Sequence, residues 1–281
     1  MERQAIRPAP EGAALRFLYH RAAGRALLKL AAARPLSVLA GRFMDSGLSR
    51  PLIRPFIRKN KIRMADYLPL PYPSFNAFFC RPIRKELRPL PREDAAFMAP
   101  CDGYLSAYHI TDGLVLPIKQ SRYTVSELLG GDPAAERFRD GVCLVFRLCV
   151  HHYHRYAYAD DGRILRRRFL EGELHTVRPI ALAALPVFTR NCREYTLMET
   201  AHFGTLCQVE VGAMLVGRIE NYKGAGVRFR RGEEKGRFLY GGSTVVLLLE
   251  KDRVQLDESI FANTARGLET PVQLGEVLET P

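Results

Sequence analysis

The chain has 281 residues, of which 47% are hydrophobic and 26% are charged, and its net charge is +12. This length and balance are enough to bury a sizeable core in one or two domains, which excludes a largely disordered protein. The charge is uneven, because residues 1–70 hold 14 Lys and Arg against four acidic residues and leave only +2 for the remainder. Such an asymmetry indicates an anionic partner, either lipid headgroups or nucleic acid.

No apolar stretch reaches the ~18–20 residues that a membrane-spanning helix needs. The best candidate, residues 26–40, is interrupted by Lys29, Arg34 and Pro35. The first four residues lack the pattern of a signal peptide, so we expect a soluble or peripheral protein, cytosolic in location. The six cysteines form no C-x-x-C pair, which predicts reduced thiols in a core rather than a disulfide framework or a zinc site.

Residues 12–61 are predicted to form helices. Apolar residues recur there at spacings of three and four with arginines between them, and Pro35, Pro51 and Pro55 divide the segment into two or three short helices. A basic amphipathic helix can lie in a membrane interface with its arginines toward phosphates. It can equally pack on its own domain with a solvated basic face. The concentration of positive charge favours the lipid interpretation.

From Asp66 onward the sequence changes in character. Seven prolines punctuate residues 69–100 around one short apolar helix, residues 75–80, and β-rich segments then alternate with turn residues. The predicted strands include residues 142–150, 195–198, 206–211, 215–219 and 244–249. We therefore predict an α+β fold, in which basic N-terminal helices, residues 1–65, precede a β-rich body of mostly antiparallel strands, residues 66–281.

The peptide bond between Gly242 and Ser243 can undergo a specific self-cleavage reaction. A Gly-Gly-Ser-Thr turn that enters an apolar strand is, taken alone, typical of a hairpin. A strained glycine, however, lets the following serine hydroxyl attack the preceding carbonyl and convert the amide to an ester. Elimination of that ester leaves a pyruvoyl group, a ketone that serves as an electron sink in decarboxylation. The serine needs a general base, and an acid that orients the base.

Several blocks of the sequence resemble those of phosphatidylserine decarboxylases. The family's Gly-Arg-Phe and Leu-Gly-Ser-Thr correspond to residues 236–238 and 241–244, with Gly241 in place of the leucine. The other matching blocks, in family order, are Phe75-Asn76-Ala77-Phe78-Phe79-Cys80-Arg81-Pro82 with Arg88-Pro89, Ala99-Pro100-Cys101-Asp102-Gly103, Tyr153-His154-Arg155, and residues 211–219. Any one block is weak, but their conjunction over residues 74–250 is specific.

The resemblance implies a self-processing enzyme that contains a pyruvoyl cofactor. It implies cleavage between Gly242 and Ser243 into chains 1–242 and 243–281 that stay associated, with Ser243 becoming the pyruvoyl group. By the same resemblance, Asp102 orients a histidine that deprotonates Ser243, and His154 assists decarboxylation or protonation of the product. Asp102 alone would more often be a turn residue before Gly103.

The resemblance does not identify the general base for self-cleavage in this chain. Many family members carry a second histidine two residues after the Tyr-His-Arg block, where this chain has Ala157. His175 is the first candidate to replace it. His152 is the second, because it shares a face with His154 if the segment is a strand. The cluster of His151, His152 and His154 lacks acidic or sulfur partners at a metal-ligand spacing, so no metal is predicted.

The sequence thus predicts decarboxylation of phosphatidylserine to phosphatidylethanolamine. The N-terminal helices would hold the protein on an anionic membrane surface, and the resemblance implies a homodimer on the cytoplasmic face of the cell membrane. A related serine-headgroup lipid is the alternative substrate, and a non-enzymatic basic membrane-binding protein is the alternative function. No nucleic-acid-binding motif is evident.

Overall fold

The computed structural model describes residues 3–8, 12–21, 23–24, 34–111, 115–118, 121–173, 175–176, 181, 186–212, 218–240 and 243–280. The helical elements before the first strand are α1 (Ala13–His20), α3 (Arg34–Asp45), η1 (Gly47–Leu52), α4 (Ile53–Asn60), η2 (Met64–Asp66), α5 (Phe75–Phe79) and η3 (Lys85–Leu87). Later helical elements are α6 (Val125–Leu128), η4 (Pro133–Phe138), α8 (Val187–Arg190) and α9 (Glu258–Ala265).

Most strands belong to one eight-stranded sheet in the order β10-β6-β7-β8-β12-β4-β1-β13, and every pairing in it is antiparallel. Its strands are β1 (Gly103–His109), β4 (Val142–Leu148), β6 (Gly162–Leu170), β7 (Arg193–Thr200), β8 (Thr205–Gly212), β10 (Arg228–Phe229), β12 (Ser243–Leu249) and β13 (Thr270–Val272). A second sheet has the order β5-β11-β9, from Arg155–Ala157, Glu234–Phe238 and Ile219–Asn221. The hairpin β2 (Val115–Ile118) and β3 (Ser121–Thr124) completes the set.

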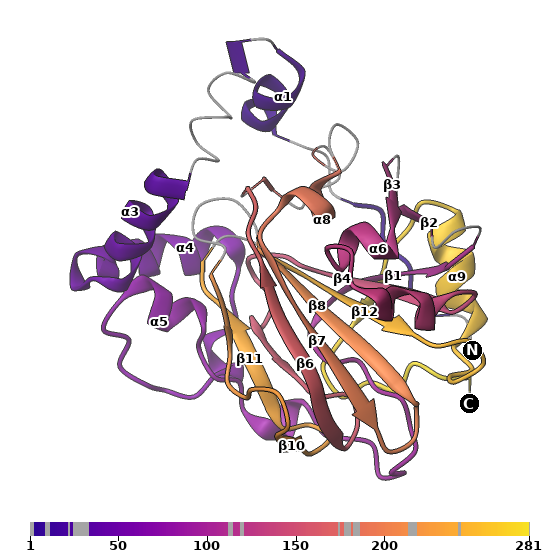
Figure 1. The fold of residues 1–281 in the computed structure, drawn as a ribbon. Helices are drawn as coiled ribbons and strands as arrows, with labels where there is room; N and C mark the ends of the chain where they lie inside the picture. Colours follow the sequence, from indigo (N-terminus) through magenta and orange to yellow (C-terminus); the bar gives the residue numbers. More distant parts are fainter. Residues whose placement is uncertain are drawn as a thin grey trace.

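Strand β12 runs through the middle of the large sheet, between β8 and β4 (Figure 1). All seven of its residues are buried. Side chains alternate across a strand, so Val245, Leu247 and Leu249 enter one core cluster while Val246 and Leu248 enter the cluster on the opposite face. Burial on both faces explains why the segment is a continuous apolar run, and the strand predicted at residues 244–249 is confirmed.

A third cluster joins the N-terminal helices to the sheet. In α4, Ile53, Phe56 and Ile57 pack against it, and the ring of Phe56 meets that of Phe75 edge-on at 5.0 Å. The basic residues of α4, Arg54, Arg58 and Lys59, are exposed on the other side. The helix α5 lies next to α3 and α4 on the same flank of the sheet (Figure 1). The N-terminal helices therefore pack on the body and also present a basic outer face.

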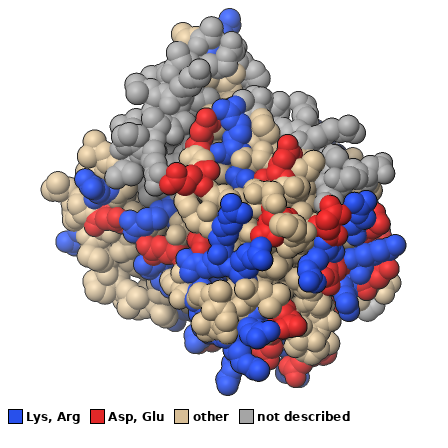
Figure 2. Space-filling view, in the orientation of Figure 1, with Lys and Arg blue, Asp and Glu red and all other residues tan. Residues whose placement is uncertain are grey.

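Charge over the large sheet is mixed rather than one-sided. On the face drawn in Figure 2, Lys and Arg side chains lie among Asp and Glu side chains. Strand β6 illustrates the cause, because Arg163 pairs with Glu199 and Arg166 pairs with Asp132 at 2.5 Å. These pairs neutralise the basic strand locally.

The α+β class predicted from the sequence is confirmed by the large antiparallel sheet and its helices. The division at residue 65 stays a prediction. Among the described residues, no helix is both long and apolar enough to cross a bilayer. Cys80, Cys101, Cys143 and Cys207 are buried and form no disulfide, and burial raises the pKa of the Cys80 thiol to about 12.

Candidate active site

Ser243 is the first residue of β12, and both neighbouring strands hold it. Its Cα pairs with Leu148 of β4 and with Gly212 of β8, so its backbone is fixed inside the sheet. The side chain is fully buried. It extends toward the same face as Val245 and Leu247, which is the face that the three-stranded sheet covers. The preceding residue, Gly242, lies outside the described residues.

His154 is the hydrogen-bond partner of Ser243. It directly precedes β5, is fully buried, and places its Nδ1 3.3 Å from Ser243 Oγ. Its Nε2 lies 3.0 Å from the carbonyl oxygen of Cys149. A carbonyl oxygen only accepts, so Nε2 carries the proton and donates it to Cys149. In that tautomer, Nδ1 has a free lone pair directed at the Ser243 hydroxyl.

The environment keeps this histidine neutral. Burial, reinforced by the charge of Arg81, lowers the pKa of His154 to about 3. The ring of Phe79 covers it at 4.1 Å with an interplanar angle of 30°, which restrains the imidazole plane. A neutral imidazole with this tautomer keeps Nδ1 available as a hydrogen-bond and proton acceptor for the serine hydroxyl.

Arg81 is a buried cation beside this site. It is 1% exposed, and its guanidinium lies over the Tyr67 ring at 4.1 Å and the Phe78 ring at 4.9 Å. Nη2 donates to the Tyr67 hydroxyl at 3.0 Å. Its contacts are thus with rings, a hydroxyl and carbonyls, and among the described residues no carboxylate pairs with it. Its uncompensated charge favours the neutral form of His154.

Asp102 lies close in the fold but has different partners. Its carboxylate accepts from Arg88 Nε at 2.7 Å and Nη2 at 2.5 Å, and from the Leu274 backbone N–H at 3.0 Å. The sequence predicted that Asp102 orients a histidine. In the structure this carboxylate binds Arg88, whose two parallel donors match it geometrically, and the Leu274 backbone, while the second nitrogen of His154 binds the carbonyl of Cys149. The orienting role of Asp102 stays a prediction.

His175 is buried but its ring is engaged elsewhere. Its Nε2 lies 2.5 Å from Glu173 Oε2, and its backbone N–H donates to Asn191 Oδ1 at 3.0 Å. Asn191 also donates to the carbonyl of Gly212, the strand partner of Ser243. His175 is therefore linked to the site through Asn191, while the structure does not bring its ring to Ser243. The adjacent residues 174 and 177–180 lie outside the described residues.

His152 was the second candidate base, on the assumption that residues 152–154 form a strand. Strand β5 begins only at Arg155, so this assumption is wrong. His152 Nδ1 accepts from the Cys149 backbone N–H at 3.0 Å, and its ring lies edge-on to Tyr104 at 4.7 Å. It stabilises the turn that places His154. Within the described ranges, no group of three or more His, Cys, Asp or Glu side chains has the geometry of a metal site.

Ala157 occupies the position where the family resemblance led us to expect a histidine. Its backbone N–H donates to the carbonyl of Pro100 at 2.8 Å, which puts it beside the segment that ends in Asp102. A histidine here would lie next to the Asp102 segment. In this chain the position holds a methyl group, and the carboxylate of Asp102 is bound by Arg88.

Two contributors were not identified from the sequence. The carbonyl of Cys149 could not be recognised from the sequence, because every residue has a backbone carbonyl and the residue type does not mark this one. Phe79 stands in a block that resembles the family, so its pattern was visible, but its contact with the histidine ring requires the fold.

Comparison with known proteins gives these residues a family context. A family model described as phosphatidylserine decarboxylase matches residues 75–278. The chain is 41% identical over 264 residues to phosphatidylserine decarboxylase proenzyme 2 of Clostridium acetobutylicum, which covers 93% of this chain and 90% of that protein. It is 37% identical to the phosphatidylserine decarboxylase proenzyme of Ruminiclostridium cellulolyticum, with 95% and 91% covered. It is 36% identical to the proenzyme of the same name from Clostridium perfringens, with 91% and 88% covered.

Proposed function

The chain belongs to the phosphatidylserine decarboxylase family, and we propose that it generates its reactive group at Ser243 with His154 as the base. The enzyme is a carboxy-lyase that converts phosphatidylserine to phosphatidylethanolamine after self-processing. One observation carries the assignment of the base: the unprotonated Nδ1 of His154 is 3.3 Å from Ser243 Oγ. Neither His152 nor His175 has its ring on this hydroxyl.

Self-cleavage follows from this pair in balanced steps. Ser243 Oγ gives its proton to His154 Nδ1 and attacks the carbonyl carbon of Gly242. The amide C–N bond breaks, the nitrogen of Ser243 takes the proton, and an ester joins Gly242 to Oγ. Loss of the Cα proton and rupture of the Cβ–Oγ bond release the Gly242 carboxylate and leave dehydroalanine. Tautomerisation and hydrolysis then release ammonia and give the pyruvoyl ketone.

The surroundings of Ser243 fit a pyruvoyl group. The new N-terminus of the short chain would be held by the pairing of β12 with Leu148 and Gly212 and would stay buried from water. When present, the group supplies a ketone that accepts the electron pair left by departing CO₂. Nδ1 of His154 would be a proton acceptor beside this position, and the ring of Phe79 would restrain the orientation of the imidazole.

Chains 1–242 and 243–281 should stay together after cleavage. The short chain contains β12, α9 and β13, and β12 pairs along its whole length with β4 and β8 of the long chain. Strand β13 pairs with β1 at the edge of the same sheet. Removal of one peptide bond leaves all of these contacts in place. A homodimer is expected from the family resemblance alone.

The N-terminal helices offer a surface for lipid, which supports peripheral attachment to a membrane. The cytoplasmic face of the cell membrane is expected from the family resemblance alone. The side chains of Leu39, Phe43 and Leu48 are 64%, 43% and 79% exposed. The exposed cations nearby in sequence are Arg42, Arg50, Arg54, Arg58, Lys59, Lys61 and Arg63. Exposed apolar side chains next to basic ones favour an anionic bilayer surface.

Intact-mass measurement tests this proposal. The wild-type protein should appear as two pieces that divide after Gly242, the smaller with a blocked pyruvoyl start. The Ser243→Ala protein should stay a single chain of 31.8 kDa. Vesicles containing phosphatidylserine, a related serine-headgroup lipid or free serine then separate the substrates. An active wild-type preparation that remains a single chain would refute the proposal.

A further inference from the structure

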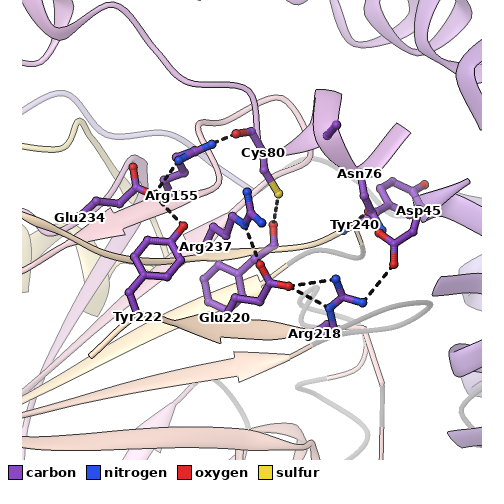
Figure 3. Close-up of polar contacts among 12 residues, drawn as sticks. Asp45, Asn76, Cys80, Arg155, Arg218, Glu220, Tyr222, Glu234, Arg237 and Tyr240 are labelled. Carbon is purple, nitrogen blue, oxygen red and sulfur yellow. Dashed lines mark hydrogen bonds and ion pairs between the residues drawn. The ribbon is translucent and has the colours of Figure 1, made fainter. Parts of the chain in front are cut away.

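The buried side-chain amide of Asn76 holds the backbone at Tyr240, two residues before Gly242. The backbone N–H of Tyr240 donates to Asn76 Oδ1 at 3.0 Å, and Asn76 is 2% exposed (Figure 3). Asn76 belongs to α5, in the block that also supplies Phe79. Tyr240 is followed by only two residues before Ser243, whose Cα is fixed by strand pairing. Consecutive Cα atoms are ~3.8 Å apart, so the position of Tyr240 limits the path to Ser243.

The orientation of the Asn76 amide is set by Asp45, the last residue of α3. Asn76 Nδ2 donates to Asp45 Oδ1 at 2.8 Å, and Arg218 Nη1 donates to Asp45 Oδ2 at 3.0 Å (Figure 3). A carboxylate accepts only, so Asp45 must face the NH₂ end of the amide. The oxygen end of Asn76 is therefore directed at Tyr240. Arg218 adds a second tie, because its carbonyl accepts from the Leu239 N–H at 3.0 Å.

The ring of Tyr240 packs against aromatic side chains of α5, one of which also covers His154. It meets Phe75 edge-on at 4.9 Å and Phe79 edge-on at 5.2 Å. Phe79 in turn covers His154. The backbone of Tyr240 is thus held by Asn76, and its ring is held by Phe75 and Phe79. Phe79 also restrains the ring of His154.

We propose that Asn76, oriented by Asp45, is a positioning residue for self-cleavage that holds the chain entering the Gly242–Ser243 bond at the Tyr240 backbone. The inference rests on the proposed function, since it concerns the same bond. Asn76 touches no reacting atom and acts through Tyr240. Reactions of this kind depend steeply on geometry, and a misplacement of about 1 Å costs about 10²-fold in rate.

Exchanging the side chains of Asp45 and Asn76 tests this relay, by which we mean the hydrogen bonds from Asp45 through Asn76 to the Tyr240 backbone. In Asn76→Asp, two carboxylates face each other and the donor to Asp45 is lost. In the double variant Asp45→Asn/Asn76→Asp, the amide at 45 donates to the carboxylate at 76, which still accepts from Tyr240, and an oxygen remains for Arg218. Precursors are pulse-labelled in cell-free translation at pH 8, and cleavage is followed on denaturing gels. We expect cleavage to slow about 10- to 100-fold in Asn76→Asp and to return to within about threefold of wild type in the double variant.

The matched control is Glu234→Gln, in the same polar network but at its far end. Glu234 binds Arg155 and the Tyr222 hydroxyl and contacts neither Asn76 nor Tyr240 (Figure 3). It should cleave at the wild-type rate. Hydroxylamine gives a second readout, because it releases the short chain only from a formed ester. A positioning defect acts before the ester forms, so hydroxylamine should not release the short chain from Asn76→Asp.

The outcomes separate this inference from the proposed function. Asn76→Asp that cleaves like wild type, or a folded double variant that remains slow, would overturn the relay. If Asn76→Asp does not fold, Asp45→Ala decides, because Asp45 is 40% exposed at its side chain and no charge is added to the core. It should cleave several-fold more slowly than wild type, and an unchanged rate would overturn the role of Asp45. Failure of the proposed function would appear as a wild-type chain that never cleaves.

Discussion

Asp102 and Ser243 lie at the same end of the sheet, on opposite sides of β4, yet their surroundings differ. Tyr104, two residues after Asp102, and Thr244, next to Ser243, are both paired with Arg147 of β4. Ser243 faces a neutral histidine whose other nitrogen is bound to a carbonyl. Asp102 is held by the two donors of an arginine and a backbone N–H.

The difference shows where reactivity resides in this chain. The carboxylate of Asp102 is satisfied by strong charge-assisted hydrogen bonds from Arg88 and by the Leu274 backbone N–H, which join three segments distant in sequence. The pair on the other side is uncharged and buried, and among the described residues His154 Nδ1 is the hydrogen-bond partner of the Ser243 hydroxyl. In this chain the carboxylate of Asp102 binds Arg88 and Leu274, while a backbone carbonyl, that of Cys149, sets the tautomer of His154.

The largest effect should come from His154→Ala. Loss of the base leaves the Ser243 hydroxyl without an acceptor, so cleavage should slow by about 10²- to 10⁴-fold. The time course of the two chains on denaturing gels measures it. Cleavage at the wild-type rate would show that another group takes the proton.

Asp102→Asn should separate stability from cleavage. Removing the charge leaves the largely buried Arg88 without its carboxylate, which should lower the free energy of unfolding by about 3 kcal/mol. Cleavage should slow less than in His154→Ala because no bond joins Asp102 to His154. Urea unfolding and cleavage rates, measured on the same preparation, check both parts. A stable variant whose cleavage is abolished would show that Asp102 acts directly in self-cleavage, as the resemblance implies.

Phe79→Leu should have an intermediate effect. The imidazole of His154 loses the flat face that restrains its plane, while a large apolar side chain remains in the core. We expect cleavage about tenfold slower and a loss of about 1–1.5 kcal/mol in stability. A cleavage rate equal to that of wild type would mean that the turn alone orients the histidine.

The pH profile should be nearly flat near neutrality. An ordinary histidine with a pKa of about 6.5 would lose about three quarters of its unprotonated form at pH 6. Because the pKa of His154 is lowered to about 3, the cleavage rate should change less than about twofold between pH 8 and pH 6. The same lowered pKa means that the unfolded state binds the proton better, so stability should fall as the pH drops below about 6.5 toward 3. A cleavage rate that titrates near 6.5 would contradict the buried, neutral base.

The smallest effect should come from His175→Ala. Its ring is bound to Glu173 at 2.5 Å, and the link to Gly212 runs through the Asn191 side chain and the His175 backbone, which alanine retains. Cleavage should stay within about twofold of wild type, with a loss of about 1 kcal/mol in stability from the side-chain contact. Blocked cleavage in a folded variant would return His175 to the position of base.

The sequence predicted well wherever a local pattern carried the information. The apolar run of β12 and the short helix of α5 follow from residue type and period, and the antiparallel α+β class follows from them. Ser243 could be proposed as the nucleophile because its chemistry depends on its covalent neighbour. His154 could not be proposed as the base from the sequence, because a histidine becomes a base through what its two nitrogens contact. For His154 those are a serine 89 residues away and a carbonyl that has no side-chain signal.

Chemical rescue of His154→Gly by imidazole tests the central claim most directly. The substitution leaves room for a small base next to Ser243, so the folded precursor should remain uncleaved until imidazole is added. Cleavage should then accelerate with imidazole concentration and with its unprotonated fraction. A folded His154→Gly precursor that cleaves at the wild-type rate without imidazole would contradict the account.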